Sequence, residues 1–173
     1  MNADELATAV GNAAAGELET ALERIHHCVG QLTDEQIWWR SAPNMNSISN
    51  LVLHLTGNLQ QWIVHGLTGA SDTRNRPAEF ADRGSIARLD LMRRLDDVVS
   101  RASAVLRGLT AGQLVAKVRI QGFDMTALDA IFNSVPHFRG HTQEIIQLTR
   151  QQLGDSYRMA WAPATPEEGA PPA

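Results

Sequence analysis

Residues 126–154 have the sequence TALDAIFNSVPHFRGHTQEIIQLTRQQLG. Apolar residues recur along this stretch at intervals of three or four, which is the period of an amphipathic helix. Thr126 followed by Asp129 predicts a capping box at its start, with Asp in place of the more usual Glu. Gly154 predicts its end. We therefore expect one long helix whose apolar face is buried in a helical core.

Three earlier segments show the same helical period. The first has its apolar stripe over residues 18–32, starts somewhere within residues 2–16 and ends at residues 33–34. The second runs over residues 47–67, and the third begins at Ser85, a residue favoured at helix N-caps. Together with the last helix they predict an all-α fold, a four-helix bundle.

The connections between these helices are long. Residues 38–44 form a loop, and residues 68–84 form a polar connection, so a topology with long crossover loops is open to the bundle. Residues 114–125 break the helical period and predict a short extended, hairpin-like segment before the last helix. We expect a single domain over residues 1–161, followed by a disordered Pro/Ala-rich tail at residues 162–173.

Composition excludes several classes of partner. A net charge of -4 and a pI near 5.8 argue against nucleic acid or an anionic membrane surface as the main partner. The most apolar segment, residues 51–67, is interrupted by His, Asn and Gln, which disfavours a membrane helix. The chain has the single cysteine Cys28 and no signal-peptide pattern over residues 1–16, so we expect a cytoplasmic location.

Three histidines are candidate metal ligands. His137 and His141 are four residues apart, so their side chains lie on the same face of the last helix. His54 lies midway along the second helix, and three neutral imidazoles with one open position are a common catalytic zinc site. In isolation an HxxxH pair is more often two surface histidines, and Phe138 stands where the HExxH metalloprotease motif has its glutamate.

The second helix has an unusual polar side. Residues 41–71 contain no Asp, Glu, Lys or Arg, although a helix face in contact with bulk water usually carries charges. The helix instead offers Asn50, His54, Asn58 and Gln61 on that side. We infer that this side faces a cavity or a partner subunit, and the alternative is an amide-rich surface.

Pro136 interrupts the last helix one residue before His137. In a helix interior, proline removes an N–H donor and clashes with the preceding turn, at a cost of about 3 kcal/mol. A kink at this position would re-aim the histidine pair. The alternative is that residues 126–154 form two shorter helices joined there.

Two further groups of residues are weaker candidates. His26 and His27 flank Cys28, but adjacent residues on a helix point in different directions, so packing explains them better than a thiol–imidazole pair. The basic segment of residues 74–76 either binds an anionic substrate or forms a solvated loop.

Four segments together resemble the DinB/YfiT-like family of metalloenzymes, and a little-characterised branch of it. They are WWR at residues 38–40, NSISNLVLHLTGN at 46–58, RNRPAEF at 74–80 and HFRGHT at 137–142. The resemblance covers most of residues 17–161. It implies an up-down-down-up bundle, often dimeric, with a divalent metal, zinc or in some members nickel.

The resemblance places the metal on His54, His137 and His141. Many relatives have Gly-Gln where this chain has Gln143-Glu144. Glu144 is one turn from His141, so it is a candidate fourth ligand, ring-orienting group or general base, or else a solvated residue. Asn58 is a second candidate for anchoring a metal-bound imidazole.

Relatives in this family include transferases and isomerases that use small thiols such as bacillithiol or mycothiol, and hydrolases. A bound ion lowers the pKa of a water molecule towards ~7 or holds a thiol as thiolate. We therefore expect a metal-dependent, thiol-dependent S-transferase that acts on a small electrophilic molecule. The alternatives are a metal-dependent hydrolase, a non-catalytic metal- or ligand-binding stress-response bundle, and a bundle whose histidines are structural. The uncharged second helix also makes a homodimer reasonable.

Overall fold

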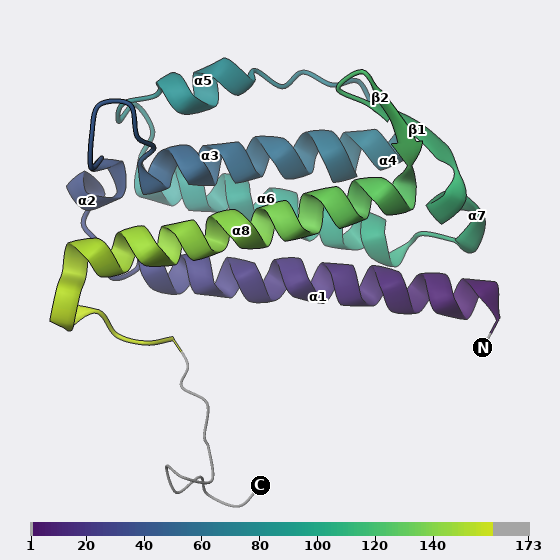
Figure 1. The fold of residues 1–173 in the computed structure, drawn as a ribbon, viewed down its shortest axis with the longest axis horizontal. Helices are drawn as coiled ribbons and strands as arrows, with labels where there is room; N and C mark the ends of the chain where they lie inside the picture. The colour runs from purple at the N-terminus through teal and green to yellow at the C-terminus, as the bar shows by residue number, and fades with distance from the viewer. Residues whose placement is uncertain (1, 161–173) are drawn as a thin grey trace, which may run out of the picture.

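Four long helices carry the fold in the computed structural model, which describes residues 2–160. They are α1 (Ala3–Val29), α3 (Ile48–Leu59), α6 (Arg88–Arg107) and α8 (Ala127–Leu153). In Figure 1, α3 and α6 run in one direction, whereas α1 and α8 run in the other. The predicted four-helix bundle and its up-down-down-up topology are confirmed.

The core lies between these four helices. Helix α1 packs against α6 and α8, and α3 packs against the same two, so each helix has two neighbours. Leu18, Leu55, Leu95 and Phe138, one from each helix, are completely buried. Burial of a side chain of this size contributes about 1.5–3 kcal/mol, so this shared apolar interior is the main stabilising contribution to the bundle.

Helix α8 forms as its sequence predicts. The Thr126 side chain accepts a hydrogen bond from the N–H of Asp129, and the Asp129 side chain accepts one from the N–H of Thr126. The helix ends at Gly154, whose φ of 53° lies in the left-handed region that favours glycine. Pro136 lies inside this uninterrupted helix, so the alternative of two shorter helices is wrong.

The second predicted helix is continuous but changes its winding. Helix α3 begins with a capping box between Ser47 and Asn50. It is followed by the π-helical segment η1 (Gln60–His65) and the short α4 (Gly66–Thr68). Single π turns inside α-helices arise where an extra residue is accommodated, and an apolar stripe alone does not reveal them.

Two predicted helix boundaries need correction. The first helix ends at Val29, and residues 34–38 form a separate short helix, α2 (Asp34–Trp38), capped by Thr33. Ser85 is not the N-cap of the third helix, because Ala87 holds that position. The hydroxyl and the N–H of Ser85 both donate to the Asp82 carboxylate, which closes a turn before the helix starts.

The segment before α8 is extended, as predicted. After α7 (Ala111–Val115), strands β1 (Lys117–Ile120) and β2 (Phe123–Thr126) pair antiparallel, with Ile120 opposite Phe123. Gln121 and Gly122 form the turn with φ values of 53° and 86°, which suit a tight hairpin. Ile120 packs with Trp62 of η1 and Ala130 of α8, so the hairpin covers one end of the bundle.

Residues 69–87 run back along the outside of α3, and we call them the crossing segment (Figure 1). This predicted polar connection contains a short helix, α5 (Arg76–Ala81), which Asn75 caps and which packs against α3. No described helix combines the length and apolar composition needed to cross a lipid bilayer. The tail predicted at residues 162–173 lies outside the described residues.

Candidate metal centre

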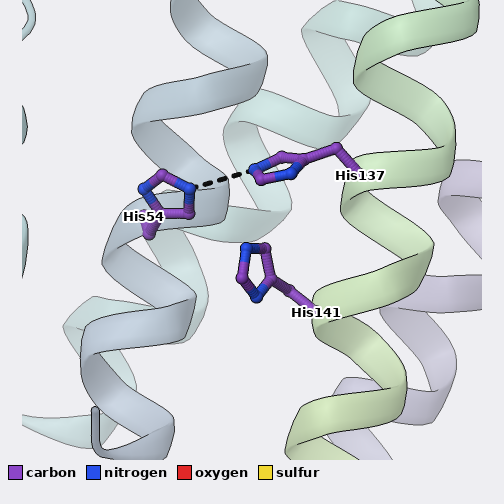
Figure 2. A group of neighbouring side chains, drawn as sticks. All are labelled: His54, His137 and His141. Carbon is purple, nitrogen blue, oxygen red and sulfur yellow. Dashed lines mark hydrogen bonds between the residues drawn. The ribbon is translucent and has the colours of Figure 1, made fainter. Parts of the chain in front are cut away.

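The three candidate histidines meet between two neighbouring helices. His54 extends from α3 towards α8, and His137 and His141 extend from successive turns of α8 towards α3 (Figure 2). One ring nitrogen from each histidine lies within 4.8 Å of the others, and the Nε2 atoms of His54 and His137 are 3.0 Å apart. Residues 83 positions apart in the sequence are therefore in direct contact.

The nitrogens of His54 and His137, 3.0 Å apart, have about the spacing of two ligands to one divalent ion, and the His141 nitrogen lies within 4.8 Å of both. In a tetrahedral zinc site with Zn–N distances of 2.0–2.1 Å, the nitrogens lie about 3.3 Å from one another. The three rings are nearly perpendicular in pairs, with interplanar angles of 80°, 84° and 88°, so none of them stacks on another. The donor set, three imidazoles, is that of a catalytic zinc site with open positions.

The protonation of His137 also suits a metal ligand. Burial lowers the pKa of His137 to about 4, with further lowering from His141, His54, Arg74 and Arg76 in that order. The ring is therefore neutral at pH 7, and neutral imidazole is the form that donates a lone pair to a metal.

Glu79 in α5 fixes the orientation of His54. Its Oε2 lies 3.0 Å from His54 Nδ1, and only 5% of the His54 side chain and 10% of the Glu79 side chain are exposed. Arg74 Nη2 lies 3.1 Å from the same nitrogen, but the carboxylate is the acceptor, so we place the proton on Nδ1. The lone pair of His54 Nε2 then faces the other two rings, the usual arrangement of a metal-bound imidazole.

Arg74 holds Glu79 in turn. The guanidinium donates from Nε to Oε1 at 2.7 Å and from Nη2 to Oε2 at 2.8 Å, a bidentate ion pair. Burial alone would raise the pKa of Glu79, but hydrogen bonds and charge from Arg74 and His54 outweigh it and lower the pKa below its ordinary value. Glu79 is therefore a carboxylate at neutral pH and a permanent acceptor for His54.

Gly57 makes room for this ion pair on the surface of α3. A Cβ atom at residue 57 would lie 2.1 Å from Glu79 Oε1 and 2.9 Å from Arg74 Nε. Both distances are shorter than side-chain contacts allow. The absence of a side chain at this helical position therefore lets the crossing segment dock with its charged pair against the helix.

The uncharged side of the second helix is buried by the chain itself. Asn50, Asn58 and Gln61 are each at most 8% exposed. Gln61 Oε1 accepts from Arg74 Nη1 at 2.9 Å, and Asn50 Nδ2 donates to the Glu79 carbonyl at 2.8 Å. The prediction that this side avoids bulk water is confirmed: the crossing segment covers Asn50 and Gln61, and Asn58 faces Ser134 of α8.

The two candidate supporting residues lie in different surroundings. Glu144 Oε2 is 2.8 Å from His141 Nδ1, and 43% of its side chain is exposed. Asn58 Oδ1 accepts from Ser134 Oγ at 3.0 Å, which joins α3 to α8. Glu79, and not Asn58, contacts Nδ1 of His54, and the role of Asn58 in the site stays a prediction.

Sequence reasoning missed Arg74 and Glu79 as parts of the site. Residues 74–76 were expected to be solvated or to bind an anion, yet only 4% of the Arg74 side chain is exposed. The available signal was the uncharged helix side, because buried amides and imidazoles need hydrogen-bond partners. The first charged residues after this uncharged helix in the sequence belong to the crossing segment, so they were the available partners.

The weaker candidate around Cys28 is explained by packing, as expected. His26 Nε2 lies 2.6 Å from Asp96 Oδ1, and His27 Nε2 lies 2.6 Å from the Arg158 carbonyl oxygen. The two rings therefore have separate partners, and neither partner is the buried thiol of Cys28.

The sequence profile of a family described as "Protein of unknown function (DUF1572)", a DinB-like family, matches residues 6–165. The chain belongs to this DinB-like family. The resemblance seen in the four sequence segments is thus confirmed at the level of family. No curated protein is similar to the chain in sequence.

Solved structures show the same DinB-like fold. A conserved protein from Enterococcus faecalis superposes with a TM-score of 0.70 at 17% identity, over 82% of this chain and 95% of its own. The DinB-like protein YjoA from Bacillus subtilis superposes with a TM-score of 0.62 at 15% identity, over 82% of this chain and 92% of its own. A DinB-like protein from Bacillus cereus superposes with a TM-score of 0.62 at 17% identity, over 79% of this chain and 91% of its own. At these identities the likeness concerns the fold alone.

Proposed function

We propose that this DinB-like protein binds one divalent metal ion through His54, His137 and His141 and uses it as the centre of an enzyme. The reaction we propose is transfer of a low-molecular-weight thiol to a small electrophilic molecule. The observation that carries the proposal is the convergence of three ring nitrogens within 4.8 Å, two of them with carboxylates on the far side of the ring.

Zinc is the ion we propose first, with nickel as the second choice. Three imidazoles and no thiolate form a donor set that suits both ions. When bound, such an ion supplies a positive charge that lowers the pKa of a thiol or a water molecule beside it. The residues around it then determine what is held there and where its proton goes.

Each surrounding residue has a separate part in this proposal. Glu79 holds His54 in the tautomer that presents Nε2, and Arg74 keeps Glu79 ionised. Glu144 contacts Nδ1 of His141 and is partly open to solvent, so it orients this ring and takes up the proton of an incoming thiol through intervening water. Asn58 fixes the spacing of the two ligand-bearing helices through Ser134.

A thiol-conjugation screen tests the enzymatic part of this proposal. The zinc-loaded full-length protein is mixed with a panel of small thiols and electrophiles, and loss of free thiol is followed. We expect turnover that disappears with a chelator and falls strongly in Glu144→Gln while its metal content is kept. Turnover of esters without any thiol would instead support a hydrolase. Metal binding without turnover of either class would contradict an enzyme and leave a metal-binding bundle.

A further inference from the structure

Arg76 holds a positive charge against Phe80, the aromatic ring that packs on His54. Its guanidinium carbon lies 5.0 Å from the centre of the Phe80 ring, and that ring lies 4.8 Å from the ring of His54. Phe80 thus joins the cation to a proposed metal ligand.

Arg76 differs from Arg74 in having no carboxylate to bind. Arg74 is buried in its pair with Glu79, whereas Arg76 is exposed and forms no ion pair with any residue between positions 2 and 160. Its guanidinium lies over the Phe80 ring. An arginine held against an aromatic ring keeps its five N–H donors in a fixed plane, free to bind a planar anion.

The charges around the triad favour an anionic ligand. Glu79 pairs with Arg74, and Glu144 is the further carboxylate, in contact with His141. With a divalent ion present, the positive charge of the ion and that of Arg76 exceed the single negative charge of Glu144. A neutral substrate would leave this excess uncompensated.

We infer that Arg76 binds a carboxylate group of the thiol cosubstrate, so that the site selects thiols that carry an acidic group. This inference rests on the proposed function, because it places the sulfur at the metal and the carboxylate at Arg76. Guanidinium and carboxylate match in shape and form two parallel hydrogen bonds. Phe80 supplies an apolar surface for the carbon chain between the two ends of the thiol.

The test compares two thiols that differ only in charge. Full-length protein loaded with Co²⁺ is titrated with 3-mercaptopropionate or 3-mercaptopropionamide, and binding is followed by the visible absorption of the cobalt. Because a charge-assisted hydrogen-bond pair is worth more than a neutral one, we expect the acid to bind about tenfold more tightly than the amide. Arg76→Gln should remove this preference and leave the cobalt content and the amide affinity unchanged.

Two variants serve as controls. Arg76→Lys keeps the charge but loses the planar fork, so an intermediate preference is expected. Arg93→Gln removes an exposed arginine on α6, outside the crossing segment, and should keep the full preference. If both thiols alter the spectrum equally, or if Arg76→Gln keeps the preference, the inference is overturned while the metal site stands. If neither thiol alters the spectrum, or cobalt does not bind, the proposed function itself fails.

Discussion

Two histidine side chains of the site have a carboxylate at the same ring position. Glu79 contacts Nδ1 of His54, and Glu144 contacts Nδ1 of His141. The two carboxylates differ in burial, since 10% of the Glu79 side chain is exposed but 43% of the Glu144 side chain. The buried contact is screened less by solvent, so Glu79 should contribute more to holding a metal ion.

Replacement of Glu79 by Gln should weaken metal binding. The variant loses the ionised acceptor that fixes the His54 tautomer, and loss of such a partner typically costs about 10–100-fold in metal affinity. Zinc affinity is measured by competition with a chromophoric chelator. Glu144→Gln is the matched control and should lose less, because its carboxylate is partly exposed. Equal affinities for Glu79→Gln and the unmodified protein would refute the role of Glu79.

The thiol of Cys28 should be unreactive in the folded protein. Cys28 is 1% exposed, and burial raises its pKa above the ordinary value despite hydrogen bonds with Thr149 and Tyr157. Only the thiolate is a good nucleophile. At pH 8, reaction with an aromatic disulfide reagent should be slow in native protein and complete in guanidinium chloride. Rapid labelling of the native protein would show that the thiol is accessible after all.

At the scale of elements, the crossing segment completes the site. It brings Arg74 and Glu79 onto α3 and covers amide side chains on the uncharged side of that helix. The helical period of residues 126–154 and their caps made α8 predictable. The contact of Glu79 with His54 was not predictable. Glu79 lies 25 residues from His54 in a segment without helical period, and the contact depends on how that segment folds back.

Gly57→Ala should destabilise the protein by displacing this segment. The added methyl group would lie 2.1 Å from Glu79 Oε1, so the buried ion pair must move away from α3. Overpacking of this kind costs about 1–3 kcal/mol in the free energy of unfolding, measured by urea denaturation. In the control Gly16→Ala, the new Cβ on α1 meets no atom within 4 Å, and helix propensity should raise stability by about 1 kcal/mol. Equal changes for both variants would contradict the close docking.

At the scale of the whole molecule, the topology decides which residues meet. The i, i+4 spacing on α8 and the uncharged side of α3 singled out the three histidines in the sequence. Their convergence depended on α3 and α8 being neighbours in the bundle, which periodicity does not reveal. The uncharged side of the second helix also suggested a homodimer, but the crossing segment covers much of that side. The homodimer therefore stays a prediction without this support. The cytoplasmic location, predicted on other grounds, also stays a prediction.

Metal binding should stabilise the whole bundle, because the ligands come from two helices. An ion that binds only the folded state adds about 2.7 kcal/mol at a free concentration 100 times its dissociation constant. Zinc should therefore raise the midpoint of thermal unfolding, and a chelator should return it to the metal-free value. His137→Ala, measured beside the unmodified protein, should show no zinc-dependent shift. A shift of the same size in that variant would place the ion elsewhere.

The most direct test of the triad is the metal content of protein purified without a histidine tag. We predict about one zinc or nickel ion per chain in the unmodified protein, held by His54, His137 and His141, the one such donor set among residues 2–160. Replacing any one of these residues with Ala should strip most of it, whereas His26→Ala, which changes a histidine with a separate partner, should leave it in place. A chain that binds no ion, or full occupancy in all three ligand variants, would contradict the account.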